Sequence, residues 1–555
     1  MKNTKVLLAF LTAVATSATL PLFGVEFENP LFHMDFSDPD LCVGGDGRVY
    51  MTASTFGGLP GLPVLATSDM VNWDYIGYAL EKHPYPEGVG SPEHGKSVYA
   101  PSIRYREATK EYVIYWGDPD HGIYRVAAKN PAGPWSEPRC IVEGSGMIDV
   151  CPLYDDDGRV YIVNGWAGSR VGINNQLTIR ELDAEETRAI SDPVVVFDGG
   201  KANHIVCEGP KFYKKDGEYW LWFPAGGVGP GYQVAARAKS IWGPYEDKIV
   251  LERGSTQING PHQGGVVYLG NGEQGTGNGD GWWFVHFSDR GAYGRISYLE
   301  PVKWKKGDWP VIGNNGEPAL LFNVPMAKEQ KPFGGLPTSD EFDSPKRGKQ
   351  WFFLGRSAQQ FAWATTYGVF RMFTTYTEKP LWETPNTMVQ RFPALSFTAT
   401  MKARVAGRRR QDEFGLVVTG GQNARIGLKY CIGKNGSEAW YDVVHTIGTQ
   451  GDKHNPGTTE EETIVGRIDA NAESPATDIY FRVEVRPGKP HPAKPLAPPP
   501  WCTFSYSTDG ANWTKVDQAF RATPGGWIGA MVGFYAIGNG NRPGVMDVDW
   551  FRFSE

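Results

Sequence analysis

Short apolar segments, each opened by a turn and rich in aromatic residues, recur along the first half of the chain. Five copies follow one another at intervals of about 50 to 65 residues. They read Asp46-Gly47-Arg48-Val49-Tyr50, Lys110-Glu111-Tyr112-Val113-Ile114-Tyr115, Asp157-Gly158-Arg159-Val160-Tyr161, Asp216-Gly217-Glu218-Tyr219-Trp220 and Asp280-Gly281-Trp282-Trp283-Phe284. Each interval is long enough for a four-stranded sheet, which is the blade of a β-propeller. A β-sandwich, the alternative, does not explain so long a period.

A different pattern, with apolar and polar positions in alternation, begins after residue 338. Residues 396–403 and 414–418 alternate as half-buried strands do. Residues 504–513 read as a hairpin, and residues 546–553 read as a closing strand. This alternation therefore predicts a second β-rich region.

The 555 residues exceed what one hydrophobic core supports, so at least two domains are expected. We predict an all-β protein with a five-bladed β-propeller over residues 27–318 and a second β-rich domain over residues 338–555. Between them, residues 319–337 carry Pro, Gly and charged residues without an apolar period, which is typical of a linker.

Three carboxylates lie at turns that interrupt apolar segments: Asp38, Asp149 and Glu208. Each apolar segment is predicted to be a strand that ends at the acid, because a nearby Gly or Pro forces a turn there. Loop ends on a rigid scaffold favour catalytic residues, and glycoside hydrolysis requires carboxylates in this way. Asp beside Pro also caps turns in many β-proteins, but the place of these acids in the repeat favours one shared site.

Composition narrows the class of protein. Aromatic residues make up 13% of the chain, with 69 Gly and 19 Trp, and we interpret this as typical of β-rich proteins that act on sugars. The net charge of −7 gives no reason to expect a nucleic-acid partner. Six Cys are too sparsely spaced for a disulfide framework or a zinc site. Because Cys42, Cys151 and Cys207 each lie close to one of the three acids, we predict small buried side chains and not bridges.

Residues 1–24 read as a secretory signal peptide. Lys2 and Lys5 precede an apolar run over residues 6–14, and small residues follow it. The run is shorter than the roughly 20 apolar residues that span a membrane. No Cys lies near the expected cleavage point, which disfavours a lipid anchor. We therefore expect a secreted or periplasmic protein without a membrane association.

With these motifs in place, residues 27–318 resemble glycoside hydrolase family 43, the five-bladed propeller family of β-xylosidases, α-L-arabinofuranosidases and arabinanases. Residues 338–555 resemble the concanavalin-like β-sandwich attached to many of its β-xylosidases. The stretches that carry the propeller resemblance are Phe36-Ser37-Asp38-Pro39-Asp40, Tyr99-Ala100-Pro101-Ser102-Ile103-Arg104-Tyr105, Ile148-Asp149-Val150-Cys151-Pro152, Glu208-Gly209-Pro210, Gly260-Pro261-His262-Gln263-Gly264-Gly265, and Tyr293-Gly294-Arg295 with Glu300-Pro301-Val302-Lys303-Trp304.

The resemblance implies a division of labour among the three acids. Asp38 is the expected general base, Glu208 the general acid, and Asp149 the carboxylate that tunes and orients. An inverting hydrolase needs one ionised carboxylate to activate water and one protonated carboxyl group for the leaving oxygen. A third carboxylate nearby helps to keep the acid protonated through like-charge repulsion.

The resemblance also implies that Tyr99, Ile148, His262 and Arg295 contact the substrate. The Tyr99 ring would stack on a sugar, although packing between blades is an equal alternative. Arg295 would hold sugar hydroxyls, the alternative being a surface salt bridge. His262 matches a histidine near the central axis where some relatives hold calcium, which makes calcium a candidate ligand; a lone His is more often structural, and no cofactor is expected to be required.

We therefore expect an inverting, exo-acting glycoside hydrolase that releases terminal β-D-xylosyl or α-L-arabinofuranosyl units from plant oligosaccharides or polysaccharides. One alternative is an endo-arabinanase of the same fold, and the other is a non-catalytic carbohydrate-binding propeller. The resemblance implies that a sandwich loop closes one side of the active-site funnel, and residues 382–386 are a candidate for it. The choice between xylose and arabinose, the loop that points inward and the oligomeric state stay open.

Overall fold

The computed structural model describes residues 24–84, 97–270, 281–354, 361–376, 381, 384, 386–451, 457–492, 494–538 and 542–555. All but the last residue of the expected signal peptide lies outside these ranges. Three residues of the candidate loop, at positions 382, 383 and 385, do so as well.

Five antiparallel sheets form the blades of a propeller. Blade 1 contains β3 (Asp40–Val43), β4 (Val49–Thr52), β5 (Gly61–Thr67) and β6 (Asp74–Leu80). Blade 2 contains β7 (Tyr99–Arg106), β8 (Glu111–Asp118), β9 (Gly122–Ala128) and β10 (Arg139–Glu143). Blade 3 contains β11 (Met147–Tyr154), β12 (Val160–Trp166), β13 (Gln176–Leu182) and β14 (Val194–Asp198). Blade 4 contains β15 (Lys211–Lys215), β16 (Glu218–Ala225), β17 (Tyr232–Ala238) and β18 (Glu246–Leu251).

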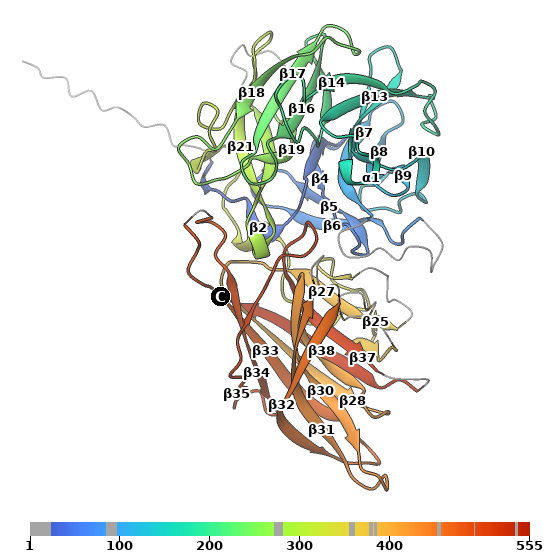
Figure 1. Ribbon diagram of the computed structural model, residues 1–555, viewed down its shortest axis with the longest axis vertical. Helices are drawn as coiled ribbons and strands as arrows, with labels where there is room; N and C mark the ends of the chain where they lie inside the picture. The colour runs from blue at the N-terminus through green and yellow to red at the C-terminus, as the bar shows by residue number, and fades with distance from the viewer. Residues whose placement is uncertain are drawn as a thin grey trace, which may run out of the picture.

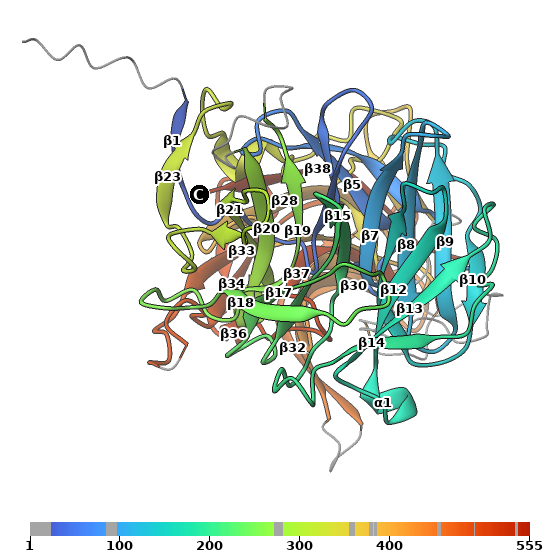
Figure 2. The ribbon, with the colours of Figure 1, turned by 90° about the horizontal axis from the view of Figure 1, so that it is seen from above.

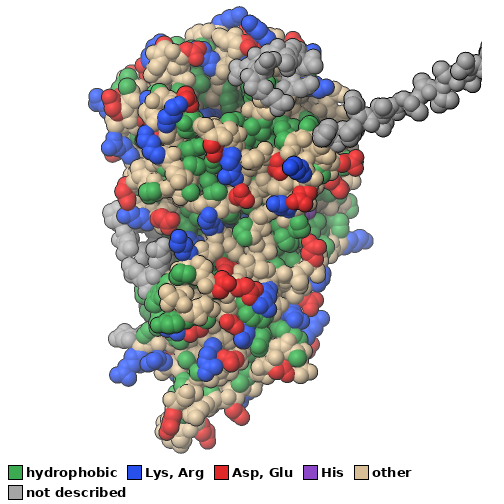
Figure 3. Space-filling view, turned by 180° about the vertical axis from the view of Figure 1, so that it is seen from behind, with side chains coloured by type: hydrophobic (Ala, Val, Ile, Leu, Met, Phe, Trp, Pro, Cys, Tyr) green, Lys and Arg blue, Asp and Glu red, His purple; other side chains and the backbone are tan. Residues whose placement is uncertain are grey.

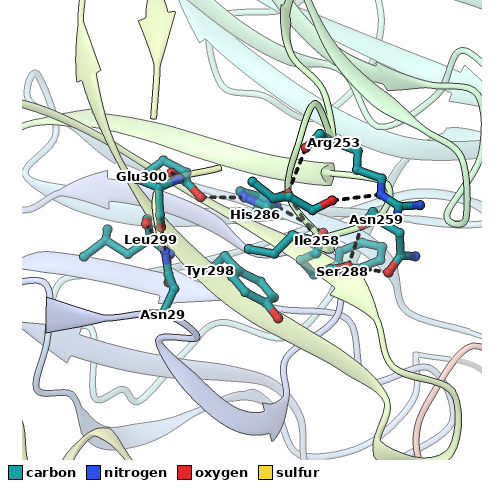
Figure 4. Close-up of polar contacts among 12 residues, drawn as sticks. Asn29, Arg253, Ile258, Asn259, His286, Ser288, Tyr298, Leu299 and Glu300 are labelled. Carbon is teal, nitrogen blue, oxygen red and sulfur yellow. Dashed lines mark hydrogen bonds and ion pairs between the residues drawn. The ribbon is translucent and has the colours of Figure 1, made fainter. Parts of the chain in front are cut away.

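Blade 5 joins the two ends of the propeller. It contains β19 (His262–Tyr268), β20 (Trp282–Asp289), β21 (Arg295–Lys303) and β22 (Val311–Ile312), and its edge is completed by β2 (Phe32–Asp35) from the start of the chain. Asn29 exchanges hydrogen bonds with the backbone of Leu299 beside this junction, and the buried pair His286 and Glu300 lies next to it (Figure 4). The sequence-distant β2 is therefore an integral strand of the last blade.

The predicted turns occupy equivalent places in the blades. Residues 46–47, 110, 157–158 and 216–217 each lie between the first and second strand of a blade, as the sequence pattern predicted. Gly47 and Gly158 have φ angles of +79° and +84°, which explains the Asp-Gly pairs, because Gly adopts this conformation without a steric penalty. Asp280 of the fifth copy lies outside the described residues.

The hydrophobic core of the propeller is divided into layers between neighbouring blades. Buried clusters join blades 1 and 2, 2 and 3, 3 and 4, 4 and 5, and 5 and 1. Trp220, Trp222 and Trp304 lie fully buried in the layer between blades 4 and 5. Much of the Trp content therefore packs between blades and does not face a ligand. In Figure 2 the strands β7 to β10 of one blade follow one another outward to the edge of the molecule.

Two larger sheets form the C-terminal sandwich. The first has the order β24 (Phe352–Phe353), β27 (Thr387–Arg391), β37 (Met531–Ile537), β29 (Glu413–Thr419), β30 (Gln422–Ile432), β31 (Ala439–Gln450) and β32 (Thr458–Ala470). The second has the order β25 (Ala362–Ala364), β26 (Phe370–Phe373), β38 (Val545–Ser554), β28 (Phe397–Ala406), β33 (Thr477–Pro487), β34 (Pro500–Ser507) and β35 (Thr514–Lys515), with β36 (Phe520–Arg521) beside β34. The all-β fold class is confirmed.

The segment predicted to be an irregular linker is partly ordered on the propeller. Within it, β23 (Leu321–Val324) pairs with β1 (Val25–Glu28), and a 3-10 turn, η2 (Pro332–Gly335), follows. Val324 and Leu336 are buried in the layer between blades 5 and 1, which their spacing in a polar stretch did not indicate. The chain thus stays bound to the propeller before it enters the sandwich.

The sandwich packs directly against the propeller (Figure 1). An apolar cluster at the interface joins Phe56 of the propeller to Phe352, Val389 and Ile528 of the sandwich. Leu59 and Phe353 also exchange two backbone hydrogen bonds across it, of 3.0 and 2.6 Å. On the face shown in Figure 3, acidic and basic side chains are interspersed over both parts.

In the described ranges the cysteines are unbridged and the helices are short. All six cysteines are free and all but Cys140 are buried, which confirms the prediction for Cys42, Cys151 and Cys207. Within the described ranges the longest helix is the single turn α1 (Gly168–Val171), and none has the length and apolarity to cross a membrane.

Candidate active site

The three acids lie where the chain enters the innermost strands of the blades. Asp38 precedes β3, Asp149 is the third residue of β11, and Glu208 lies three residues before β15. The prediction that each acid ends a buried strand is therefore wrong. Residues 205–207 form no strand, and Ile205 and Val206 are 52% and 39% exposed.

A positive φ angle marks the entrance to each innermost strand. The residues and φ angles are Asp38 (+56°), Ala100 (+34°), Asp149 (+59°), Gly209 (+57°) and Gln263 (+32°). In β7, β11 and β19 the strand register shifts at this point, which is the mark of a β-bulge. Such bends re-aim side chains, and the strain that they store in non-glycine residues is typical of functional sites.

Asp38 is held by donors from two directions. The Ser54 hydroxyl donates to its Oδ2 at 2.6 Å, and Arg295 Nη1 donates to its Oδ1 at 3.2 Å. Ser54 in turn accepts the backbone N–H of Ala100 at 2.7 Å, so that blade 2 helps to place it. The Asp38 side chain is only 5% exposed, and these bonds fix its orientation.

Glu208 is the acid that solvent reaches most easily. Its side chain is 29% exposed, and its Oε1 lies 2.9 Å from Nε2 of the buried His262. His262 therefore contacts a predicted catalytic acid on the side away from the pocket. Its Nδ1 has no hydrogen-bond partner among the described residues.

Asp149 interacts with both other acids through their charges, and it also accepts a backbone hydrogen bond beside Glu208. Its Oδ2 accepts the N–H of Gly209, the residue after Glu208, at 2.8 Å, and the Gln263 amide at 3.3 Å. Burial raises the pKa of Asp149 well above its usual value, and the carboxylates of Glu208 and Asp38 raise it further.

These side chains line one pocket with a cavity volume of about 410 Å³. This lies at the small end of the range of about 300–1,000 Å³ for ligand pockets. The predicted residues Tyr99, Ile148 and Arg295 line it together with the three acids, and His262 lies behind Glu208. All seven predicted site residues are thus brought together.

The structure bears on the alternatives that the sequence left open for Tyr99 and Arg295. Tyr99 packs edge-on against Phe56, with ring centroids 5.2 Å apart, and also faces the pocket. Arg295 forms its ion pair with Asp38 inside the funnel and is only 11% exposed, so the surface salt bridge is excluded. Its guanidinium carbon lies 4.8 Å from the Phe287 ring centre.

Sequence reasoning missed the residue that the sandwich contributes. Trp527 lies at the pocket, with its ring centre 5.5 Å from the guanidinium carbon of Arg295. A hydrogen bond from Trp527 also partly offsets the burial that raises the pKa of Tyr99. The pair Gly525-Gly526 before an aromatic residue indicated a turn, but no local pattern showed that this turn reaches the propeller.

Calcium was a candidate ligand of this site. Two buried atoms here have no hydrogen-bond partner among the described residues, His262 Nδ1 and Gln263 Oε1. Across the described ranges, however, no three His, Cys, Asp or Glu side chains converge so as to hold a metal ion. His262 Nε2 is already engaged by Glu208. These residues do not make a calcium site, and no chemical step below depends on one.

Three carboxyl groups and an arginine around a small pocket on a β-propeller define a carbohydrate-cleaving site of the glycosidase class. Comparison of the sequence with models of known protein families identifies the family. The model of glycosyl hydrolases family 43 matches residues 27–310, and that of the β-xylosidase C-terminal concanavalin A-like domain matches residues 339–554. The chain belongs to glycoside hydrolase family 43 and is a glycoside hydrolase.

Individual relatives carry two kinds of name. A provisionally named β-xylosidase of Xylanibacter ruminicola is 36% identical over 297 residues, about half of each chain (52% of this one and 53% of the relative). A non-reducing end α-L-arabinofuranosidase of Bacteroides ovatus is 29% identical over 100% of this chain and 99% of its own. The solved structure of a xylan β-1,4-xylosidase from Bacillus halodurans has a TM-score of 0.76 at 20% identity, covers 95% of this chain and 100% of its own, and shows the fold alone.

Proposed function

We propose that the protein is an inverting, exo-acting hydrolase that releases terminal β-D-xylosyl or α-L-arabinofuranosyl units from plant oligosaccharides or polysaccharides. The observation that carries this proposal is the convergence of Asp38, Asp149 and Glu208 on one small pocket. The names of the relatives support the two pentoses as terminal units.

In the proposed mechanism, Asp38 activates a water molecule and Glu208 protonates the leaving oxygen. Asp38 suits the first role because Ser54 and Arg295 hold its carboxylate in a fixed orientation. Glu208 suits the second because its side chain is partly exposed, where the departing sugar must lie. Asp149 supports the acid by accepting the backbone N–H of Gly209, the residue that follows Glu208.

Exo action follows from the wall that the sandwich supplies. A propeller alone offers a funnel that is open at one side, and an aromatic side chain placed across it limits the space to a chain end. Trp527 lies at the pocket beside Arg295. A small pocket with one aromatic wall suits a terminal sugar better than an internal segment of a polymer.

A panel of aryl pentosides tests the proposal. We expect hydrolysis of the 4-nitrophenyl β-D-xyloside, the α-L-arabinofuranoside or both, with release of single pentoses from the matching oligosaccharides. Early-time NMR should show the inverted anomer of the released sugar. Release of mixed internal fragments would instead indicate an endo-arabinanase, and glycan binding without hydrolysis of any substrate would indicate a non-catalytic propeller.

We also propose export of the chain to the periplasm or the medium, which matches a polymeric substrate outside the cell. The leader-like composition of residues 1–24 supports this proposal. Mass spectrometry of the protein from its native host tests it, because export predicts a new N-terminus near residue 24. A mature chain in the cytoplasm that retains Met1 contradicts it.

A further inference from the structure

A single turn of the sandwich, residues 525–530, carries Trp527 to the active site. We call this segment the Trp527 turn. It is closed by a hydrogen bond from Gly525 N–H to the Ile528 carbonyl at 2.8 Å, and Trp527 has a φ angle of +66°. The Trp527 side chain is 55% exposed, so burial alone does not fix its position. Its place at the pocket depends on how the turn is anchored to the propeller.

The anchor is a buried carboxylate on the propeller. Gly529 N–H donates to Oδ2 of Asp35 at 2.6 Å, a contact between residues 494 positions apart. The adjacent Ala530 N–H donates to the Ala292 carbonyl at 2.7 Å. The Trp527 turn is therefore bound to the propeller within three residues of the indole ring.

The contact leaves no room for side chains. A Cβ atom on Gly529 would lie 2.7 Å from Cα and N of Gly294, and one on Gly294 would lie 2.5 Å from Oδ2 of Asp35. Two glycine backbones thus meet at the Asp35 carboxylate. Gly294 directly precedes Arg295, so the same junction borders the arginine that binds Asp38.

Asp35 is an expensive group to bury at this place. It is only 4% exposed, and its Oδ1 has no hydrogen-bond partner in the part of the chain that the structure describes. Burial raises its pKa to about 6, while Arg391 and Arg295 act in the opposite direction. A buried carboxylate that is only partly paired lowers the stability of a fold, so a role in function is the better explanation for it.

We propose that Asp35 is a positioning residue for substrate binding. By holding the Gly529 amide, its carboxylate sets Trp527 against Arg295 and so places the aromatic wall for the terminal sugar. Asp35 lies on β2, which leads within three residues to Asp38, so one short segment aligns both the sandwich turn and the proposed general base. The inference rests on the proposed function for the identity of the sugar.

A double-mutant cycle tests this assignment with the aryl pentoside that the enzyme hydrolyses fastest. The variants are Asp35→Leu, Trp527→Ala and the two combined, with Asp35→Asn as the conservative change, because its amide oxygen can still accept the Gly529 N–H. We expect Asp35→Leu and Trp527→Ala each to raise KM about tenfold while kcat changes by less than about twofold. Asp35→Asn should restore KM to within about twofold of the parent.

The decisive comparison is the effect of Asp35→Leu when Trp527 is already Ala. If Asp35 acts through Trp527, the second substitution adds less than about twofold to KM. An equal factor in both backgrounds, or no effect of Asp35→Leu in either, overturns the proposal. If Asp35→Leu does not fold, Asp35→Ser, which is too short to reach Gly529, takes its place in the cycle.

A control separates positioning from general loosening of the interface. Tyr293→Phe removes another bond between the two domains, from the Tyr293 hydroxyl to the Leu395 carbonyl at 2.7 Å. We expect it to lower the melting temperature and leave KM unchanged. A rise of KM as large as that of Asp35→Leu would assign the effect to the interface as a whole and overturn the role of Asp35. Complete loss of aryl pentoside hydrolysis in the parent enzyme would instead refute the proposed function.

Discussion

At the residue scale, the active site is a set of acids whose surroundings differ. Asp38 has two side-chain donors, Asp149 is buried with a raised pKa, and Glu208 is partly open to solvent beside His262. Three carboxyl groups of the same chemistry can therefore take three roles. In the proposed mechanism, environment, and not residue type, distinguishes base, acid and orienting group.

The role of Glu208 predicts how its substitution depends on the substrate. Glu208→Gln removes the proton donor and keeps the size of the side chain. We expect kcat to fall by about 10²–10⁴-fold for oligosaccharides, which need protonation of the leaving oxygen, and far less for aryl glycosides with activated leaving groups. Steady-state kinetics on both substrate types measures this. An equal loss on both would contradict the assignment.

The raised pKa of Asp35 predicts that the free energy of unfolding depends on pH. Its pKa is raised to about 6 in the folded protein, against roughly 3.9 in an unfolded chain. The folded state therefore holds the proton more tightly, and the stabilisation is fully present below about pH 4 and is lost as the pH rises through about 6. For this one group the loss between pH 4 and pH 7 is about 2–3 kcal/mol.

The variant Asp35→Asn stays neutral and removes this dependence. We expect its free energy of unfolding to exceed that of the parent by a margin that grows by about 2–3 kcal/mol between pH 4 and pH 7. Urea unfolding of both proteins at several pH values gives the margin. A margin that does not change with pH would show that Asp35 is ionised over the whole range.

At the element scale, the site is formed by residues at the entrance to each innermost strand. The same left-handed bend recurs in all five blades, from Asp38 to Gln263, and turns side chains toward the pocket. In blade 4 this bend is at Gly209, where a Cβ atom would lie 2.4 Å from Cγ of Gln263. Close packing between neighbouring strand entrances therefore leaves little freedom for the backbone beside Glu208.

Gly209→Ala tests this packing, with Gly158→Ala as its matched control. Both glycines have positive φ angles, but nothing lies within 4 Å of a Cβ atom at Gly158. We expect each variant to lose about 1 kcal/mol or more of stability from backbone strain. Only Gly209→Ala should also lower kcat, by about tenfold or more, because it displaces Glu208. Similar activities in the two variants would argue against a constrained entrance.

At the scale of the whole molecule, the two domains share one active site. The interface cluster joins Phe56 and Tyr99 of the propeller to Ile528 of the sandwich, and Tyr99 also lines the pocket. The buried Arg391 of the sandwich lies with its guanidinium carbon 4.6 Å from the Phe36 ring centre, two residues before Asp38. The sandwich thus contributes a residue, Trp527, to the lining of the pocket and packs against the segment that carries Asp38.

Deletion of residues 338–555 should therefore cost stability as well as activity. Loss of the sandwich exposes Phe56 and removes Trp527, and each large apolar side chain left in water forfeits about 1.5–3 kcal/mol. We expect a melting temperature lower by about 5 °C or more and a kcat/KM lower by about a hundredfold on short oligosaccharides. Calorimetry and kinetics measure the two effects.

Full-length Trp527→Ala separates the two contributions, because it removes the wall and keeps the interface. It should lower kcat/KM about tenfold, through a higher KM, without the loss in melting temperature. A truncated propeller that stays soluble and equally active would make the sandwich an independent module.

The sequence by itself determined the features that depend on local chemistry. Asp-Gly turns followed by aromatic strands predicted five blades, because a turn with positive φ and an apolar strand are each encoded within a few residues. The same repeat placed Asp38, Asp149 and Glu208 in one site, since equivalent positions of the blades meet at one pocket. The absence of bridges at Cys42, Cys151 and Cys207 was also predicted, from their places beside the three acids.

Only the tertiary structure decided what depends on contacts between distant segments. It moved the acids from the ends of strands to their entrances; before Glu208, for example, the apolar residues 205–206 are exposed and form no strand, and Val206 lines the pocket. It also joined Asp35 to Gly529 across 494 residues and brought Trp527 to Arg295. No local pattern encodes such contacts, because they arise only when two separately patterned domains pack against each other.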